Sequence, residues 1–274
     1  MSGFSTSWLE AREPVDLRAR NPEMIAIFAA RLAERRQALA RPLLVLDLGA
    51  GTGATLRALA PHLPEDTCWR FAEHDPALVE RSIEMADRHG HAVEAIESDL
   101  SQGLSGDLAE ALLEDVDAVT TSAFLDLVSR GWIEGAASTL AARGLPFLAM
   151  LTFDGRQEAD PAHPLDARIR EAMAAHQGRD KGFGPALGPA AHATAADAFR
   201  AAGFTVTQGP SDWEALRNET DFQSMLVAGW AEAARETGID PQEVDAWLDL
   251  RLGQIAKSGL VTRVGHQDLV ALPV

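Results

Sequence analysis

A strand-like apolar run in this chain ends in a turn with glycines at every second position. The run covers residues 43–47, and the glycines that follow it are Gly49, Gly51 and Gly53, with Ala50 between the first two. Glycine lets the backbone approach a ligand closely, and a helix that begins just behind such a turn offers unpaired N–H groups. The stretch therefore predicts a cradle for a nucleotide-type ligand.

Two cofactor classes use a turn of this kind. In the pattern G-x-G-x-x-G/A, Gly49, Gly51 and Ala54 satisfy the dinucleotide fingerprint, with Glu73 as the acidic residue about 20 positions further on. However, Asp47 stands two residues before the first glycine. A carboxylate there is unfavourable beside a pyrophosphate, whereas it suits a cofactor whose nearby groups are an ammonium and a sulfonium. Asp47 therefore favours S-adenosylmethionine over a dinucleotide.

The segment from Asp47 to Gly53 resembles the first motif of the class I methyltransferases, acidic-x-Gly-x-Gly-x-Gly. The resemblance covers roughly residues 40–208 and the final strand. It implies an α/β fold with a doubly wound, mostly parallel seven-stranded sheet, an antiparallel last strand and helices on both faces. It also implies S-adenosyl-L-methionine as cofactor and S-adenosyl-L-homocysteine as product. The subfamily stays open.

The resemblance assigns further cofactor contacts at the ends of the second and third expected strands. Glu73, followed by His74, matches the position of the carboxylate that binds both ribose hydroxyls. Asp99 matches the acidic residue that accepts a hydrogen bond from the adenine amino group, and Leu100 matches an apolar residue beside the ring. These residues are expected to surround the nucleoside part of the cofactor.

The end of the fourth expected strand lies under the transferring methyl group in the family. The resemblance therefore implies that Ser122 and Ala123 line the cofactor, whereas Phe124 and Asp126 reach towards the substrate. The Asp/Asn-Pro-Pro-aromatic motif of enzymes that methylate exocyclic or amide nitrogens is missing here. Together with the negative charge of the chain, its absence disfavours a nucleic-acid or protein-glutamine target.

An N-terminal segment precedes these motifs and is expected to form a helical lid over residues 1–40. Pro22 suits the first turn of a helix over residues 22–39. Many small-molecule methyltransferases fold such a segment over the cofactor. Arg20 or Arg18, just before this helix, is then expected to pair with the methionine carboxylate, although an exposed basic turn is an alternative interpretation.

Residues after the fifth expected strand supply candidates for the acceptor site. If the acceptor is a hydroxyl, a general base is required, and the first candidates are His176, Asp154 and Asp126. Lys181 and Phe183 lie in a loop that combines charges, glycines and an aromatic residue, so they are candidate substrate contacts. The histidine spacing matches no standard metal motif, and we expect no metal.

Apolar runs alternate with helix-like stretches, which indicates β-α-β units on a parallel sheet. A single domain is expected, with a cofactor-binding core over residues 41–208, a helical insertion over 209–260 and a final strand within 261–274. The regular alternation is expected to break at Asp154-Gly155. The predicted strands cover residues 43–47, 68–73, 92–96, 117–121, 146–152, 203–208 and 264–272.

Composition limits the classes of protein and of partner. The chain has 274 residues, of which 46% are hydrophobic, and 24 Lys+Arg against 41 Asp+Glu leave a net charge of −17. This charge repels a phosphate backbone, so no nucleic-acid partner is expected. A single cysteine, Cys68, excludes an internal disulfide. No apolar run approaches the length of a membrane span, so we expect a cytoplasmic protein, a monomer or homodimer.

These observations lead to three functional hypotheses. The first is an S-adenosylmethionine-dependent methyltransferase that acts on a small-molecule metabolite by in-line methyl transfer. The second is an NAD(P)-dependent Rossmann oxidoreductase that uses the same glycine turn. The third is a non-catalytic S-adenosylmethionine-binding regulatory protein, because no acceptor-binding motif is recognised in the sequence.

Overall fold

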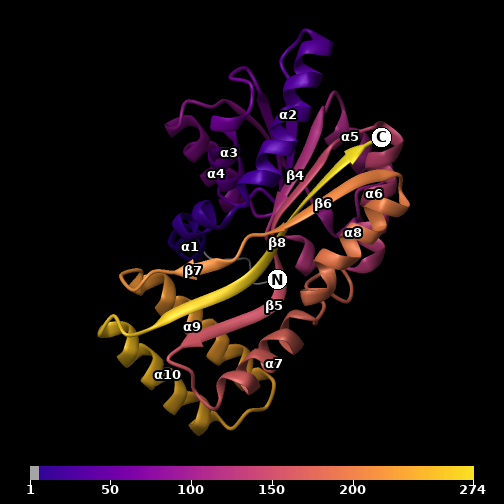
Figure 1. The fold of residues 1–274 in the computed structure, drawn as a ribbon. Coiled ribbons are helices and arrows are strands. Elements are labelled where there is room, and N and C mark those ends of the chain that lie inside the picture. Colours follow the sequence, from indigo (N-terminus) through magenta and orange to yellow (C-terminus); the bar gives the residue numbers. More distant parts are fainter. Residues whose placement is uncertain (1–5) are drawn as a thin grey trace.

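The chain folds around one mixed β-sheet, and the computed structural model describes residues 6–274 (Figure 1). The strand order is β3-β2-β1-β4-β5-β8-β6, with the short β7 paired to β8 beside this path. The neighbours from β3 to β5 are parallel, whereas β8 lies antiparallel between β5 and β6. The strands are β1 (Leu44–Leu48), β2 (Cys68–Glu73), β3 (Val93–Glu97), β4 (Ala118–Ser122), β5 (Phe147–Asp160), β6 (Phe204–Pro210), β7 (Trp213–Ala215) and β8 (Val261–Pro273).

Helices cover both faces of the sheet and its lower end. Apolar residues of α2, α3 and α4 pack on one face, with Val45 and Phe71, and those of α5, α6 and α8 pack on the other face, with Leu46 and Val119. The helices are α1 (Thr6–Ala19), α2 (Pro22–Leu39), α3 (Ala54–Leu59), α4 (Pro76–Arg88), α5 (Gly106–Leu113), α6 (Arg130–Arg143), α7 (Asp166–Gln177), α8 (Ala191–Ala201), α9 (Thr220–Glu236) and α10 (Pro241–Ala256).

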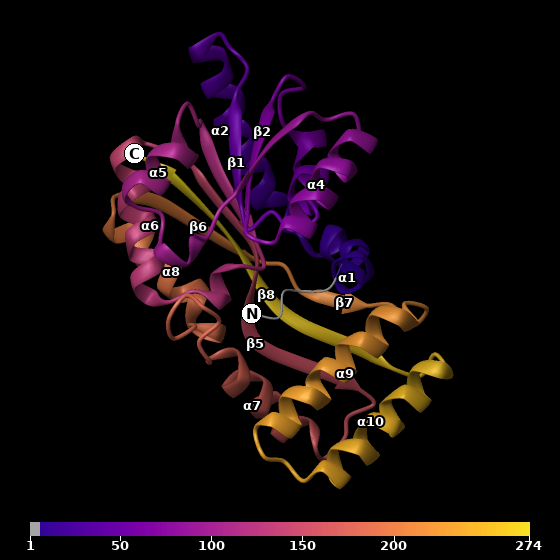
Figure 2. The ribbon, with the colours of Figure 1, turned by 180° about the vertical axis from the view of Figure 1, so that it is seen from behind.

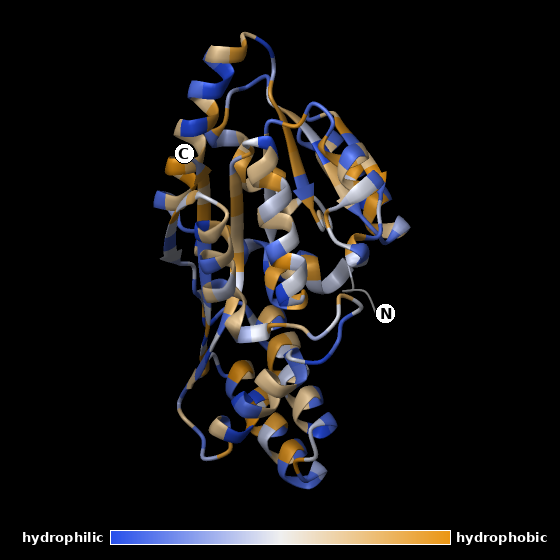
Figure 3. Cartoon of the chain, turned by 90° about the vertical axis from the view of Figure 1, so that its right-hand side faces the viewer, coloured by the Kyte–Doolittle hydropathy of each residue, from blue (hydrophilic) through white to orange (hydrophobic). Residues whose placement is uncertain are grey.

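Successive residues of the central strands therefore pack into the cores on opposite faces of the sheet, because side chains alternate between the two faces of a strand. In Figure 3 the helices carry hydrophilic and hydrophobic stretches side by side, in keeping with one buried and one solvated face. The prediction of a doubly wound sheet with an antiparallel last strand is confirmed. None of the helices described over residues 6–274 has both the length and the apolar character needed to cross a membrane.

Two strands are much longer than the sequence predicts. β5 continues through Asp154-Gly155 to Asp160, and β8 begins at Val261. The expected break at Asp154-Gly155 is wrong because a β-bulge absorbs the irregularity: the register with β8 shifts between Phe153 and Gln157, and pairing then resumes. The extended halves of β5 and β8, together with α7, α9 and α10, form the lower half of the molecule (Figures 1 and 2).

The N-terminal helix α1 lies at the junction between the sheet and the lower half (Figure 2). The next helix, α2, begins and ends as predicted, and Asn21 caps it: its Oδ1 accepts hydrogen bonds from the N–H groups of Glu23 and Met24 at 3.0 and 3.3 Å. α1 was not predicted as a separate helix, because its sequence has no apolar periodicity and contains Pro14. The division of the chain into lid, core and insertion stays a prediction.

Candidate functional site

The glycine turn connects β1 to α3 and requires a left-handed backbone at each of its glycines. The φ angles of Gly49, Gly51 and Gly53 are +66°, +56° and +78°. A Cβ added at Gly49 would stand 3.0 Å from the Phe124 ring, so this position has neither the conformation nor the space for a side chain. The turn is closed by the N–H of Gly53, which donates to the Ala50 carbonyl oxygen at 2.8 Å.

Glu73 ties the end of β2 to this turn. Its Oε2 accepts the N–H of Gly51 at 2.8 Å, and its Oε1 accepts the N–H groups of His74 and Asp75 at 2.8 and 3.1 Å. These bonds fix the carboxylate beside the turn, and each carboxylate oxygen has two lone pairs. Oε1 already accepts two N–H groups and Oε2 accepts one, so Oε2 keeps one lone pair for a ligand hydroxyl group.

A cavity of about 1030 Å³ lies at the carboxyl ends of β1 to β4, and we name it the first cavity. The structure brings most of the predicted cofactor-binding residues to its wall: Arg20, Gly49, Ala50, Gly51, Glu73, His74, Asp99, Leu100, Ser122 and Ala123. The candidate substrate contacts Phe124, Lys181 and Phe183, and the candidate base His176, also line it. Gly53 and Asp47 lie behind the wall.

Asp99 meets the first cavity at the end of β3. Its Oδ1 accepts the N–H of Ser101 at 2.9 Å, which caps a short 3-10 helix over Leu100–Gln102. The Ser101 side chain, and after it this backbone N–H, hold the pKa of Asp99 below its ordinary value. This ionised, exposed carboxylate lies beside the buried Leu100. It can therefore accept a hydrogen bond from an amino group on a flat ring that packs against the Leu100 side chain.

Asp47 is the next-to-last residue of β1, two positions before Gly49, and is buried. Its Oδ1 accepts the Thr120 hydroxyl at 2.8 Å, whereas Oδ2 has no hydrogen-bond partner within residues 6–274, with the side chain of Thr55 beside it. Burial raises the pKa of Asp47 to about 7, an effect that the hydroxyl groups only partly offset. This carboxylate is therefore poised to respond to a cation in the first cavity.

Arg20 places a positive charge near the same end of the first cavity. It is buried, and its Nη1 donates to the Ser122 hydroxyl at 3.1 Å. The carboxylates of Asp16, Asp47 and Asp268 favour its charged form, although burial as the larger effect lowers its pKa. A buried cation, Arg20, and a buried carboxyl group, Asp47, therefore lie near this end of the first cavity. Their charges complement the carboxylate and the ammonium of an amino acid.

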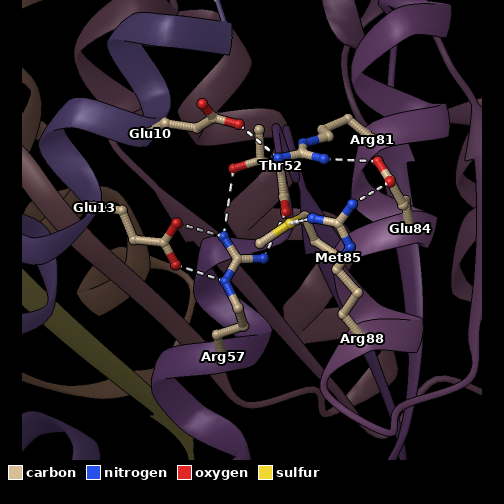
Figure 4. Close-up of polar contacts among 8 residues, drawn as sticks. All are labelled: Glu10, Glu13, Thr52, Arg57, Arg81, Glu84, Met85 and Arg88. Atoms are coloured by element: carbon tan, nitrogen blue, oxygen red, sulfur yellow. Dashed lines mark hydrogen bonds and ion pairs between the residues drawn. The ribbon is translucent and has the colours of Figure 1, made fainter.

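Helix α1 is tied to the elements that carry the glycine turn by ion pairs (Figure 4). Glu13 accepts two hydrogen bonds from Arg57 of α3, at 2.5 and 2.8 Å, and the same guanidinium donates to the Thr52 carbonyl oxygen at 2.7 Å. Glu10 pairs with Arg81 of α4 at 2.6 Å. α1 therefore covers the turn, and its residues Trp8, Leu9, Arg12 and Asp16 line the first cavity.

A smaller cavity of about 330 Å³ adjoins the first and lies in the lower half; we name it the second cavity. Ala123 and Leu127 border both cavities. The candidate Asp126 lines the second cavity rather than the first, and two of the tryptophans of the helical insertion, Trp213 and Trp230, face it. Sequence reasoning did not identify Trp8, Arg12, Gln157, Met173, Met225 or His266, which also line this cavity.

Asp154 lies outside both cavities. Its Oδ2 pairs with Nε of Arg156 at 2.9 Å and accepts a hydrogen bond from Gln267 at 3.1 Å, and the Arg156 guanidinium also binds Asp212 at 2.7 Å. These hydrogen bonds hold the pKa of Asp154 below its ordinary value, although its partial burial acts in the opposite direction. The structure therefore does not bring Asp154 to the other candidate bases.

Comparison with known proteins gives likeness in structure only. No protein-family model matches the chain, and no curated protein sequence matches it. A cyclopropane synthase from Mycobacterium tuberculosis is 13% identical at a TM-score of 0.44, over 93% of this chain and 97% of that one. A methyltransferase from Geobacter sulfurreducens, solved with S-adenosyl-L-homocysteine, is 18% identical at a TM-score of 0.44, over 94% and 93%.

A geranyl diphosphate C-methyltransferase from Streptomyces coelicolor A3(2), solved with Mg²⁺, geranyl diphosphate and S-adenosyl-L-homocysteine, is also similar. It is 10% identical at a TM-score of 0.44, over 89% of this chain and 80% of that one. At these identities and TM-scores the likeness supports no assignment of activity. The function of this chain therefore rests on its own residues.

Proposed function

We propose that this protein is an S-adenosylmethionine-dependent methyltransferase that acts on a small molecule. The observation that carries the proposal is the pairing of opposite charges at one end of the first cavity with ribose and base acceptors at the other. Arg20 lines this cavity and suits the carboxylate of a methionine group, and the buried Asp47 carboxylate, which does not line the cavity, favours a nearby ammonium through its charge. Glu73 and Asp99 suit the ribose hydroxyls and the adenine amino group.

The topology supports this cofactor over a dinucleotide. A dinucleotide fold of the Rossmann type has the strand order 3-2-1-4-5-6, whereas here the antiparallel β8 lies between β5 and β6. A pyrophosphate over the glycine turn would also approach the Asp47 carboxylate, whose ionised form it disfavours. The oxidoreductase alternative therefore has less support than the methyltransferase.

Bound S-adenosylmethionine would supply a methyl group that is already activated by its sulfonium. The chain then needs mainly to position the acceptor and exclude water. Ser122 ends β4 and lines the first cavity, and Ala123 and Leu127, just after the strand, border both cavities. Trp8 and Arg12 of α1 line both cavities, so the lid covers the place where they meet. An in-line transfer across this border is the mechanism we infer.

A general base is needed only for an acceptor that must lose a proton. Our candidates for this base are Asp126, which lines the second cavity, and His176, which lines both cavities. The pKa of His176 is lowered, mainly by its burial, so its ring is neutral and can accept a proton at neutral pH. The ion-paired Asp154 has less support as a base.

Calorimetric titration tests the proposal directly. Wild-type protein is titrated with S-adenosylmethionine, S-adenosylhomocysteine, NAD and NADP, and the same ligands are tested on Glu73→Gln and Glu158→Gln. Loss of a ribose acceptor should weaken binding of both sulfur compounds by about tenfold or more, because hydrogen bonds to charged groups contribute about 1.5–3 kcal/mol. Glu158 lies on the exposed part of β5 and is the matched control.

Two results would contradict the proposal. Tighter binding of NAD or NADP than of S-adenosylmethionine would show that the cofactor is a dinucleotide. Binding of S-adenosylmethionine without its conversion to S-adenosylhomocysteine in the presence of a metabolite extract would favour a regulatory protein. A cytoplasmic location and a monomeric or homodimeric state remain parts of the proposal, to be checked by cell fractionation and sedimentation.

A further inference from the structure

The second cavity contains polar atoms that the protein leaves without partners. Oδ1 of Asp126 and Oε1 of Gln157 are buried and have no hydrogen-bond partner within residues 6–274. Both side chains line the cavity, and each residue is 7% exposed. A buried oxygen of this kind is unfavourable unless a donor or a cation meets it. A ligand in the second cavity is therefore expected to bring a hydrogen-bond donor or a positive charge.

The cationic side chains near Asp126 do not form an ion pair with it. Arg12 lines both cavities, but its Nε pairs with Asp16 Oδ2 at 3.1 Å and its guanidinium lies over the Trp213 ring, 5.9 Å from the centroid. Lys181 lines the first cavity and interacts with Asp126 only at a distance. The carboxylate thus lacks a counter-ion in the part of the chain that the structure describes.

The histidines of the second cavity do not supply the missing charge either. Burial lowers the pKa of His266 to about 4, so its ring is neutral at pH 7. Burial and Lys181 also lower the pKa of His176, whose Nε2 lies 3.4 Å from Glu236. Burial raises the pKa of Asp126 to about 6, and the carboxyl is therefore still mostly ionised at pH 7. Of the charged side chains that line the cavity, Arg12 already pairs with Asp16, so within residues 6–274 the Asp126 carboxylate is left without an ion-pair partner.

The rest of the wall suits an apolar molecule that carries a cation. Phe153, Trp213 and Trp230 present aromatic rings, and Met173 and Met225 present flexible thioethers. Aromatic faces attract a cation within about 6 Å, and methionine adapts to irregular shapes. A volume of about 330 Å³ also falls within the range of small-molecule sites, which is about 300–1,000 Å³.

We propose that the second cavity holds the methyl acceptor, and that this acceptor is an amine on an apolar body whose ammonium pairs with Asp126. The proposal rests on the proposed methyltransferase function. The ammonium first gives a proton to the Asp126 carboxylate. The nitrogen lone pair then forms the N–C bond while the C–S bond breaks, the electron pair stays on sulfur, and the positive charge passes to the methylated nitrogen.

A matched pair of probes tests this assignment. 2-Phenylethylamine and 2-phenylethanol differ in the ammonium, and their binding is followed by tryptophan fluorescence in protein saturated with S-adenosylhomocysteine. The amine should bind wild type about tenfold more tightly than the alcohol, because charge-assisted hydrogen bonds are roughly twice as strong as neutral ones. Asp126→Asn should remove this preference, whereas the control Asp249→Asn, an exposed acid of α10, should keep it.

The wild type alone provides a second test. Protonation of Asp126 below about pH 5 should reduce the preference for the amine, whatever the folding of the variant. Equal binding of the two probes, failure of the amine to bind, or an unchanged preference in Asp126→Asn would overturn the acceptor assignment. Failure of S-adenosylhomocysteine to bind wild type, measured by calorimetry without any probe, would instead overturn the proposed function.

Discussion

Asp47 couples the protonation state of the protein to its proposed cofactor. Its folded-state pKa of about 7 lies above the ordinary value, because burial outweighs the hydrogen bonds of its hydroxyl neighbours and the charge of Arg20. An ammonium and a sulfonium nearby favour the ionised form and should lower this pKa on binding. The free protein then holds more protons than the complex below about pH 7, and binding should release them.

We therefore predict that affinity for S-adenosylmethionine rises between about pH 5.5 and about pH 7 and then levels off. Calorimetry in two buffers of different ionisation enthalpy measures the proton release. Asp47→Asn should bind more weakly and lose this pH dependence. A wild-type affinity that stays constant over the same range would show that Asp47 does not sense the ligand.

Gly49 combines two separate obstacles to a side chain. Its φ is +66°, and a Cβ would lie 3.0 Å from the Phe124 ring. Gly203, in contrast, has a φ of +94° with no atom within 4 Å of the added Cβ. Gly203→Ala thus reports backbone strain alone and should cost about 1–2 kcal/mol of unfolding free energy.

We predict that Gly49→Ala costs more than Gly203→Ala, by about 1 kcal/mol or more, since the Phe124 ring must move. Urea unfolding of the two variants measures the difference. Gly49→Ala should also weaken cofactor binding, whereas Gly203→Ala should not. Equal losses of stability would show that Phe124 yields at no cost.

At the scale of elements, α1 is the proposed lid, and the ion pairs of Glu10 and Glu13 tie it to α4 and α3. Arg57 is the more consequential partner, because its side chain is 6% exposed and it also binds the Thr52 carbonyl oxygen of the glycine turn. Loss of the Glu13 carboxylate leaves this buried guanidinium with a weaker acceptor. The lid and the turn should then loosen together.

We predict that Glu13→Gln increases the dissociation rate of S-adenosylmethionine by about fivefold or more. The reason is that removing one partner of a partly buried ion pair destabilises a protein more than removing one partner of an exposed pair. Stopped-flow fluorescence measures the rate. Glu110→Gln is the control, because Glu110 of α5 pairs with Arg143 of α6 at 2.6 Å and neither residue contacts α1 through an ion pair. Similar rates in both variants would show that α1 does not act as a lid.

The elements differ in how well their sequence predicts them. α2 and β2 were predicted at their observed bounds, because a proline and an asparagine mark the start of α2 and apolar runs mark the strands. β7 has three residues, too few for a pattern, and the continuation of β5 alternates around a bulge. The local sequence contains no signal for pairing that depends on a distant strand.

The candidate site divides in the same way. The glycine turn, Glu73 and Asp99 were predictable because their spacing along β1 to β3 is local. The wall of the second cavity comes from α1, β5, α7, α9 and β8, which are far apart in the chain. The sequence around Gln157 and His266 therefore contains no pattern that predicts their place in a site. Asp154 was a candidate only by its place after a strand, and the bulge turns it towards Arg156.

At the scale of the whole molecule, the lower half depends on one buried ion pair. Nη2 of Arg251 on α10 lies 2.6 Å from both carboxylate oxygens of Asp166 on α7, and Trp247 donates to the same carboxylate at 2.9 Å. The Arg251 side chain is 0% exposed. The same two helices also share an exposed pair, Arg168 with Glu243 at 2.8 Å.

We predict that Arg251→Ala destabilises the protein by about 3–5 kcal/mol, whereas Arg168→Ala costs about 1 kcal/mol or less. Thermal unfolding measures both. Cofactor affinity of the folded Arg251→Ala fraction should stay near that of wild type, because neither helix supplies the glycine turn. A parallel loss of cofactor binding would mean that the two halves fold as one cooperative unit.

The long pairing of β5 with β8 has a consequence for selectivity. The two strands pair from the sheet core, at Phe147 with Ala271, to the lower half, at Asp160 with Val261, with register shifts between Ala149 and Thr152 and between Phe153 and Gln157. A hydrogen-bonded ladder stretches very little. We therefore expect the backbone of these strands to fix the depth of the second cavity, so that a ligand there is selected by its length as well as by its charge.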